Sequence, residues 1–202
     1  MSEVLPQISI APTSGRIAPE QLFAFEPSEI RLEIGFGDGE HLVNEASAAP
    51  DVAFIGCEPF VNGVAKAVAA ISDRGLRNIR IFGGDARDLL NALPDASLSR
   101  IELLYPDPWP KRRHHKRRIV SQDFLNAVAR VLRVGCEFRF ATDIDDYCAW
   151  TLDRVRAAPH FRWTARRPCD WLTPWDGWAA TRYEQKARRE GRSSAYLTFV
   201  RT

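Results

Sequence analysis

Short apolar segments of four or five residues recur along this chain, and a helical pattern of apolar residues follows most of them. The predicted strands cover residues 30–34, 52–55, 78–82, 101–105 and 137–141, with two late strands at 161–165 and 195–201. The predicted helices cover residues 40–49, 61–73, 87–93, 122–132 and 147–157. Strands that alternate with helices form a mostly parallel, twisted sheet with helices on both faces. We therefore predict an α/β fold, in which the two late strands pair antiparallel.

The length and composition fit one domain without a membrane-spanning segment. A chain of 202 residues with 45% hydrophobic and 27% charged residues is typical of a globular domain, and it contains no run of about 18 apolar residues. We assign residues 29–202 to that domain and residues 1–28, which contain four prolines, to an N-terminal arm. The arm lacks the pattern of a secretory signal. Four scattered cysteines without a CxxC pair favour reduced thiols in the cytoplasm and argue against a zinc site.

The loop after the first predicted strand carries the first candidate ligand contacts, because ligands of such sheets bind beyond the carboxyl ends of the strands. Gly35 and Gly37 let the backbone approach a ligand closely, and Glu33 lies just before them. A dinucleotide fingerprint needs glycine where this chain has Glu40, whose carboxylate would repel a pyrophosphate. The loop therefore favours a nucleoside with a positive group and no phosphate, such as S-adenosylmethionine. A tight turn without a ligand is the alternative.

Two further acids follow the second and third predicted strands. Glu58 lies 23 residues beyond Gly35, where an acid would accept the ribose hydroxyls of a nucleoside. Asp85 follows a glycine pair and precedes Ala86, so its carboxylate could accept an adenine amine, cap the next helix, or do both. Both acids are candidate cofactor contacts, and a surface glutamate is the alternative for Glu58.

The segment after the fourth predicted strand combines a rigid loop with a basic run. Three prolines around Asp107 and Trp109 hold the backbone extended, so that a carboxylate and an indole are presented together to a planar base. Residues 111–118 then contain six Lys or Arg and no acid, which is typical of a contact with a phosphate backbone. His114 and His115 lack the i,i+4 spacing of a metal pair, and we place them in the same RNA-facing strip.

Charge is distributed unevenly, and the late part of the chain adds further candidates. The first 60 residues contain ten acids and two bases, whereas residues 61–202 contain 26 bases and 16 acids. Asp143 follows the fifth predicted strand at the same edge of the sheet. Trp171, Trp175 and Trp178 could stack on bases, but core packing is an equal alternative. A second basic strip follows at residues 186–192.

In these motifs the chain resembles the bacterial tRNA (guanine-N7-)-methyltransferases, over residues 16–197. The most specific match is residues 106–111 with the basic run behind them, supported by residues 32–37, 141–143 and 181–184. The resemblance implies a Rossmann-like methyltransferase fold that binds S-adenosylmethionine. It also implies that the substrate is a guanine in the variable loop of tRNA. Ser194, three places after Gly191, departs from the family, in which we expect an apolar residue.

The resemblance also implies roles for individual residues. The implied cofactor contacts are Glu33, Glu58, Asp85 and Asp107, to which the loops themselves add Gly35, Gly37 and Ala86. Asp107 stands at the position that the family treats as catalytic. The implied substrate contacts are Lys111, Asp143, Thr181, Arg182, Tyr183 and Glu184. The implied RNA contacts are Arg113, His114, His115, Lys116, Arg117 and Arg118, to which the basic run adds Arg112. We expect no metal and leave the oligomeric state open between monomer and homodimer.

The expected chemistry depends mainly on positioning. Guanine N7 has a lone pair in the plane of the ring and attacks a sulfonium methyl group without first losing a proton. We expect Asp107 to orient the guanine and offset the positive charge of the product, while Lys111 and Arg182 hold phosphate or ribose. One rival is a methyltransferase for an exocyclic base amine, whose Asp-Pro-Pro-aromatic turn this chain matches only in part. A second rival is a non-catalytic RNA-binding module, and Glu40 disfavours a nicotinamide enzyme.

Overall fold

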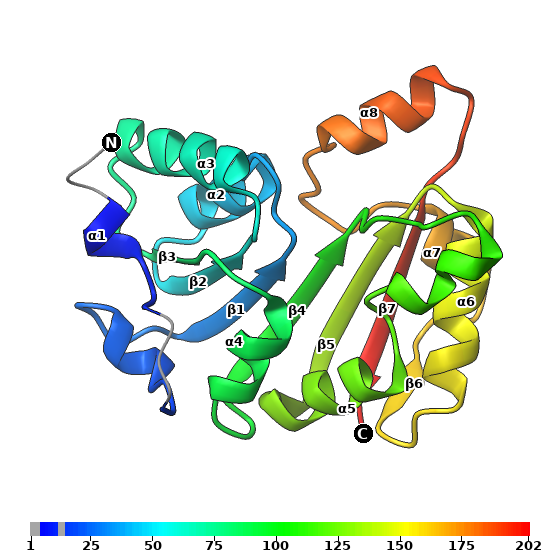
Figure 1. Cartoon of the computed structure of the whole chain (residues 1–202), viewed down its shortest axis with the longest axis horizontal. Helices are drawn as coiled ribbons and strands as arrows, with labels where there is room; N and C mark the ends of the chain where they lie inside the picture. The colour runs from blue at the N-terminus through cyan, green and yellow to red at the C-terminus, as the bar shows by residue number, and fades with distance from the viewer. Residues whose placement is uncertain (1–4, 12–14) are drawn as a thin grey trace.

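The computed structural model describes residues 5–11 and 15–202, which form a seven-stranded sheet between layers of helices (Figure 1). The strands are β1 (Glu29–Ile34), β2 (Val52–Cys57), β3 (Ile79–Phe82), β4 (Leu98–Leu104), β5 (Leu132–Thr142), β6 (Phe161–Trp163) and β7 (Ala195–Arg201). Their order in the sheet is β3-β2-β1-β4-β5-β7-β6, and β7 runs antiparallel to both of its neighbours. The strand order reverses between β1 and β4, which makes their carboxyl ends the switch point where α/β sheets bind ligands.

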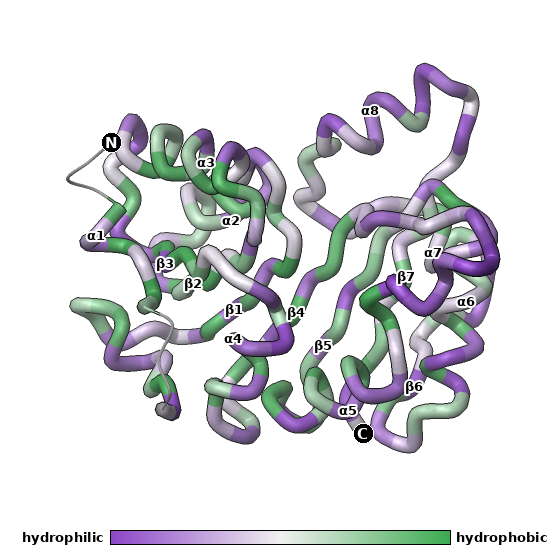
Figure 2. The backbone as a smooth tube through the Cα atoms, in the orientation of Figure 1, coloured by the Kyte–Doolittle hydropathy of each residue, from purple (hydrophilic) through white to green (hydrophobic). Residues whose placement is uncertain are grey.

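Helices cover both faces of this sheet, and the alternation along β2 shows why. Phe54 packs with residues of the helices that follow β1 and β2, whereas Ile55 packs on the other face with residues of the helices that follow β3 and β4. The helical segments among the described residues are α1 (Leu5–Ile8), η1 (Pro19–Leu22), α2 (Glu40–Ala48), α3 (Val61–Asp73), α4 (Ala86–Ala92), η2 (Arg112–Arg117), α5 (Gln122–Val131), α6 (Asp145–Arg156), α7 (Cys169–Leu172) and α8 (Arg182–Arg189). Figure 2 shows the apolar residues along the strands and a mainly polar α8, which projects above the sheet.

The predicted order of strands and helices is confirmed. The bounds of α3 and β7 are those that the sequence predicted, and the two late strands pair antiparallel through Arg162 and Val200. None of the helices in the described part of the chain is long and apolar enough to cross a membrane.

The structure has two helical turns in the N-terminal arm, where the sequence predicted no helix. Leu5–Ile8 is α-helical, and Pro19–Leu22 is a 3₁₀ helix. Ile8 and Ile17 are buried, and the Ile10 N–H donates to the carbonyl of Ile81 at the β3 edge over 2.8 Å. Apolar side chains that pack on the sheet thus fix the described part of the arm. The division of the chain at residue 28 stays a prediction.

Further differences concern the segments around β5 and the basic run. β5 begins at Leu132, five residues before its predicted start, because the pairing with β4 shifts register between Leu98 and Arg100 and accommodates extra residues around Gly135. The basic run forms the 3₁₀ helix η2, and α7 and α8 have no counterpart in the prediction.

Candidate functional site

A cavity of about 580 Å³ opens where β1, β2, β3 and β4 end. The loops that follow these strands line it, together with the first residues of α8. Its lining includes these residues that the sequence singled out: Gly35, Gly37, Glu58, Asp85, Ala86, Asp107, Arg117, Arg182 and Tyr183. The structure therefore brings most of the predicted cofactor contacts, the predicted catalytic carboxylate and part of the basic run to one cavity.

The glycine-rich loop between β1 and α2 lies against helix α3. Gly37 has a φ of 57°, in the region that favours glycine. Gly63 of α3 faces it so closely that a Cβ at Gly63 would lie 2.4 Å from the carbonyl oxygen of Gly37. The absence of a side chain at Gly63 therefore permits the approach of α3 that holds the loop in place.

Glu58 is held by two backbone donors at the edge of this loop. Its Oε2 accepts a hydrogen bond of 2.8 Å from the Gly37 N–H, and its Oε1 accepts one of 3.0 Å from the Phe60 N–H. A carboxylate oxygen has two lone-pair directions, so each oxygen keeps one acceptor position. The geometry suits two neighbouring hydroxyl groups of a ligand.

Asp85 begins helix α4, which confirms its predicted role as a helix cap. Its Oδ1 accepts from the Arg87 N–H over 2.8 Å, and its Oδ2 lies 3.2 Å from the Arg87 guanidinium. Beside it, burial and the neighbouring carboxylates raise the pKa of the Cys57 thiol to about 12. Cys57 is thus a neutral part of the cavity wall at physiological pH.

The loop that carries Asp107 turns sharply on either side of it. Tyr105 and Trp109 have φ values of 49° and 44°, which non-glycine residues adopt at a cost in energy. Asp107 is exposed, and both it and Trp109 line the cavity. The indole of Trp109 lies 4.8 Å from the Arg117 guanidinium and 6.0 Å from the His114 ring. Helix η2 therefore packs directly against the Asp107 loop.

Ser194, the departure from the family pattern, has a defined partner in the structure. Its Oγ accepts a hydrogen bond of 2.9 Å from the hydroxyl of Tyr105, and burial raises the pKa of that phenol above its ordinary value. Tyr105 also stacks on Tyr183, with ring centroids 6.5 Å apart. The serine therefore anchors the residue that leads into the Asp107 loop.

The four predicted substrate contacts at the start of α8 divide into two pairs. Thr181 and Glu184 are buried, and the Thr181 hydroxyl caps the helix by accepting from the Glu184 N–H over 3.2 Å. Arg182 and Tyr183 face the cavity, where Arg182 forms an ion pair with Asp38 of the glycine-rich loop. Within this motif, one pair builds the helix start and the other lines the cavity.

Besides Thr181 and Glu184, three more of the predicted cofactor and substrate contacts lie outside the lining of this cavity. Lys111 is exposed beside it, and Asp143 is paired with the Arg192 guanidinium over 2.7 Å. Glu33 is buried on β1, where its Oε2 lies 2.9 Å from Nδ1 of His41 on α2. Sequence reasoning gave no role to His41 or to Asp38.

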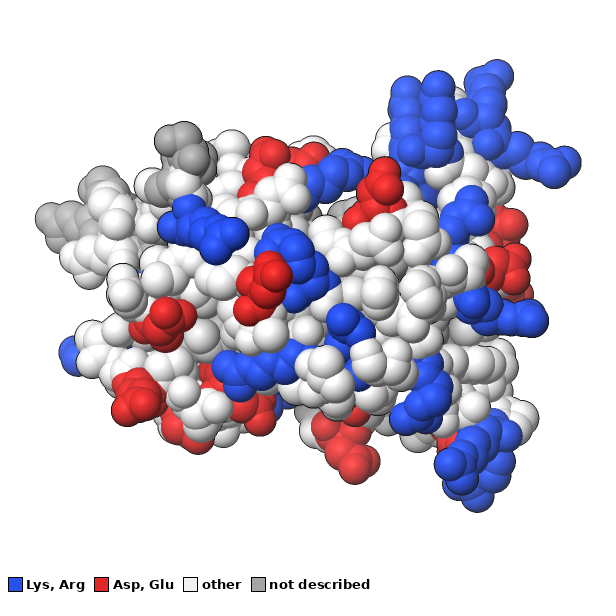
Figure 3. All heavy atoms as spheres, turned by 90° about the horizontal axis from the view of Figure 1, so that it is seen from below, with Lys and Arg blue, Asp and Glu red and all other residues white. Residues whose placement is uncertain are grey.

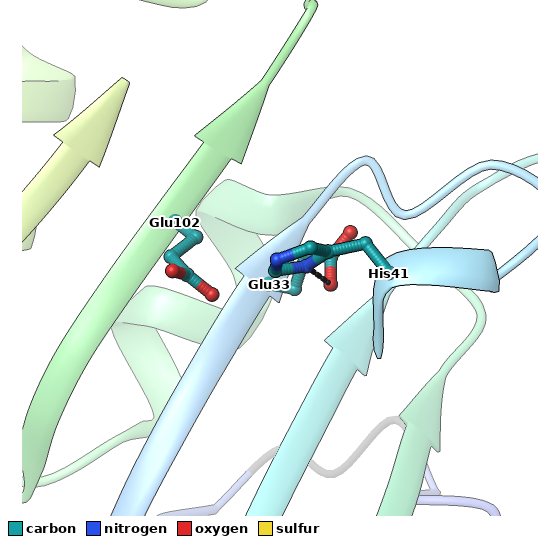
Figure 4. Close-up of side chains that lie close together, drawn as sticks. All are labelled: Glu33, His41 and Glu102. Carbon is teal, nitrogen blue, oxygen red and sulfur yellow. Dashed lines mark hydrogen bonds and ion pairs between the residues drawn. The ribbon is translucent and has the colours of Figure 1, made fainter. Parts of the chain in front are cut away.

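Glu33, His41 and Glu102 form a buried cluster behind the glycine-rich loop (Figure 4). Their ligand-type atoms all lie within 4.8 Å of one another, as metal ligands could. Burial alone would lower the pKa of His41, but Glu33, Glu102 and Glu45 raise it to about 9. The guanidinium of Arg100 also lies 3.5 Å from Glu102. A protonated imidazole and arginines thus balance these carboxylates, and the role of Glu33 as a cofactor contact stays a prediction.

Most of the basic run is exposed on η2, but its last residue is not. Arg112, Arg113, Lys116 and Arg117 are exposed, and His114 and His115 are half-buried. Arg118 is 2% exposed, so its side chain is not available to an RNA phosphate in this conformation. In Figure 3, Lys and Arg side chains gather on the side that carries β5, β7 and α6, in keeping with the charge asymmetry of the sequence.

The late tryptophans pack against the protein itself. Trp175 Nε1 donates to the Thr198 hydroxyl over 2.8 Å, and Trp178 Nε1 donates to the Glu184 carboxylate over 2.5 Å. The Trp178 ring lies 4.8 Å from the His41 ring, measured between centroids. Of the two interpretations left open for these residues, the packing one agrees with these contacts.

Comparison with known proteins agrees with this geometry. A family model described as a putative methyltransferase matches residues 27–197. A tRNA (guanine-N(7)-)-methyltransferase of Rhodopseudomonas palustris is 55% identical over the whole chain, which covers 80% of that relative. One of Rhizobium meliloti is 57% identical over 91% of the chain and 81% of the relative.

Solved structures show the same fold. The aminoglycoside resistance methyltransferase NpmB1 superposes with a TM-score of 0.60 at 17% identity, covering 87% of this chain and 88% of that one. The predicted Rossmann-like methyltransferase fold is thereby confirmed. With relatives more than half identical over nearly its whole length, the chain belongs to the tRNA (guanine-N(7)-)-methyltransferase family.

Proposed function

We propose that this chain transfers the methyl group of S-adenosylmethionine to N7 of a guanine in the variable loop of tRNA. The observation that carries the proposal is the position of Asp107. It lines the same cavity as Glu58 and Asp85, and the loop that holds it packs against the basic helix η2. A nucleoside cofactor and an RNA base can therefore reach one carboxylate from two sides. Relatives named for this activity support the proposal.

The residues of the cavity fit S-adenosylmethionine. Glu58 keeps acceptor positions for the ribose hydroxyls, and Asp85 can accept the adenine amine beside the start of α4. Arg87 and Arg182 also line the cavity, but each is already paired with a carboxylate, Asp85 and Asp38 respectively. Because these two arginines are neutralised while Glu58 and Asp107 also line the cavity, the cavity favours a cationic ligand over a phosphate. When bound, S-adenosylmethionine supplies an electrophilic methyl group on its sulfonium.

Asp107 has two tasks in this proposal. Its carboxylate accepts hydrogen bonds from the N–H groups of the guanine and so orients N7, which needs no base to become nucleophilic. It also offsets the positive charge that the ring gains on methylation. Trp109 provides a flat surface for the base at the same place. The enzyme thus works by alignment and electrostatics, without a proton transfer at N7.

The exposed cations beside the cavity bind the tRNA backbone. Lys111, Arg112, Arg113 and Lys116 are exposed, and the guanidinium of Arg117 lies over the Trp109 ring. Arg182 and Tyr183 of α8 also line the cavity. Phosphate contacts of this kind position the RNA without reading its sequence. Asp143 is paired with Arg192 and so orients the second basic strip, residues 186–192.

The test is methyl transfer from radiolabelled S-adenosylmethionine to unmodified tRNA, followed by nucleoside analysis. We expect the label in N7-methylguanosine. Label on an exocyclic amine would keep the methyltransferase fold and contradict the assignment of Asp107. A folded protein that binds tRNA but transfers no methyl group would contradict the proposal as a whole.

A further inference from the structure

Arg118 differs from the other cations of the basic run in its surroundings. Its side chain has no exposed surface, whereas Arg112, Arg113, Lys116 and Arg117 are exposed. A guanidinium is costly to bury unless its charge and its donors are satisfied. Something other than RNA must therefore account for the position of Arg118.

Its partners come from two segments that are distant in sequence. Arg118 Nε donates a hydrogen bond of 2.9 Å to the carbonyl oxygen of Pro108. Its terminal nitrogen forms an ion pair with Asp146 on the first turn of α6. Its Cζ lies 4.8 Å from the ring centroid of Tyr147 and 5.1 Å from that of Trp150, both also on α6. The guanidinium thus joins the Pro108 loop to α6.

The rings of Tyr147 and Trp150, which pack on the guanidinium, have fixed positions of their own. Trp150 Nε1 donates to the carbonyl oxygen of Val120 over 2.8 Å, two residues beyond Arg118. Tyr147 is fully buried and packs against Phe140 of β5, with ring centroids 5.3 Å apart. Arg118 therefore lies in a rigid pocket that belongs to the core of the sheet.

The Pro108 carbonyl is well placed to control Asp107. It lies one residue beyond Asp107, in a loop where Pro106, Pro108 and Pro110 have no N–H to donate. Such a loop can be held through its carbonyl groups, and Arg118 donates a hydrogen bond to one of them. A rigid hold at this point fixes the backbone that carries the Asp107 carboxylate into the cavity.

We propose that Arg118 is a positioning residue for Asp107, and that it does not bind RNA. Through the Pro108 carbonyl, its buried guanidinium sets the place of the Asp107 carboxylate relative to the cavity. Arg117 and Arg118 then have opposite tasks: Arg117 faces the cavity beside Trp109, and Arg118 anchors the loop to α6. The inference rests on the proposed function, because it concerns the residue on which that reaction depends.

The experiment compares Arg118→Lys with Lys116→Met and Arg130→Lys in the full chain. A lysine at 118 keeps the charge but cannot reach Pro108 and Asp146 together. We expect its kcat, at saturating tRNA and S-adenosylmethionine, to fall about tenfold or more, because small misplacements of a reacting group are costly. The affinity for S-adenosylmethionine and the salt dependence of tRNA binding should not change. Lys116→Met should instead lower the salt slope by about one.

Arg130→Lys is the matched control for a general loss of stability. Arg130 also donates to backbone carbonyls, including that of Leu93 over 2.9 Å, and pairs with Asp95, but it lies before the amino end of β5, away from the cavity. Its kcat should remain at the wild-type value even if its Tm falls, so a loss of kcat in Arg118→Lys alone is not explained by lower stability. Arg118→Ala should regain kcat when ethylguanidinium is added, which a merely destabilised protein would not do.

A second variant serves if Arg118→Lys does not fold. Asp146 is 64% exposed, so Asp146→Asn should fold and lower kcat about threefold by weakening the hold on the guanidinium. The inference would be overturned if Arg118→Lys folds and shows a lower salt slope of tRNA binding with unchanged kcat. If Arg118→Lys is unfolded, an unchanged kcat in Asp146→Asn would overturn it. Both outcomes leave wild-type methyl transfer intact, so they are distinct from a failure of the proposed function.

Discussion

The Gly37 N–H donates a hydrogen bond of 2.8 Å to Oε2 of Glu58, so the glycine-rich loop and the strand end beside it hold each other. Glu58→Gln replaces one acceptor oxygen by a donor that cannot accept from Gly37 or Phe60. We expect the Kd for S-adenosylmethionine to rise about 10- to 100-fold, since a hydrogen bond to a charged group contributes roughly 1.5–3 kcal/mol. Calorimetric titration with S-adenosylmethionine measures this change.

The control for this variant is Glu29→Gln. Glu29 lies at the amino end of β1, where its carboxylate is 2.7 Å from the Arg31 guanidinium. Loss of this partly exposed ion pair should leave cofactor affinity within about twofold of the wild type. Equal affinities of the Glu58→Gln and wild-type proteins would show that Glu58 has no part in binding the cofactor.

Gly63 provides a steric test of the same loop. In Gly63→Ala the new Cβ would lie 2.4 Å from the Gly37 carbonyl oxygen, so α3 or the loop must shift. We expect weaker binding of S-adenosylmethionine and a loss of unfolding free energy of about 1–3 kcal/mol. Gly83→Ala is the control, because nothing lies within 4 Å of a Cβ at that position. Denaturant unfolding and cofactor titration of both variants would show whether the loop needs this close approach.

Much of the fold could be predicted because its strands are short, apolar and regularly spaced. The bounds of α3 and β7 follow from the pattern alone. The start of β5 could not, because Gly135 and a shift of register extend that strand among exposed residues that have no apolar alternation. The first helical turn of the arm, α1, packs against β3, which is a tertiary contact and has no local signal.

For the candidate site, the sequence predicted which side chains lie at the strand ends. It did not predict which of the candidate residues are buried. Glu58, Asp85 and Asp107 line one cavity because the carboxyl ends of neighbouring strands meet at the switch point. Arg118 could not be distinguished from its basic neighbours, because burial beneath α6 depends on the path of the chain. The local signal for the buried pair is His41, the second residue of the helix that follows the Glu33 strand.

Asp107→Asn tests the central role in the reaction. The amide keeps the size of the side chain but removes the charge that offsets the methylated guanine and one of its acceptor oxygens. We expect kcat to fall about 100-fold or more while the Kd for S-adenosylmethionine changes only a fewfold, as single-turnover assays and titration would show. Asp95→Asn, at an exposed ion pair with Arg130, should keep full activity. Undiminished turnover in Asp107→Asn would contradict the assignment.

The buried pair of His41 and Glu33 predicts a pH dependence of stability. The pKa of His41 is about 9 in the folded protein, against 6.5 for an ordinary histidine, because the attraction of Glu33, Glu102 and Glu45 exceeds the effect of burial. The folded state therefore binds the proton more tightly than the unfolded state. The stabilisation from this proton is complete below pH 6.5 and is lost as the pH rises toward about 9.

Thermal unfolding of the wild type and of His41→Gln between pH 6 and pH 10 measures this effect. Glutamine keeps a donor for the Glu33 carboxylate but cannot carry the proton. We expect the wild type to exceed the variant in Tm by roughly 5–10 °C near pH 6, and the difference to shrink steadily up to about pH 9. Because the His41 ring packs on Trp178, which bonds to Glu184 of α8, the variant should also loosen the start of α8. A difference in Tm that is constant with pH would mean that folding does not shift the pKa of His41.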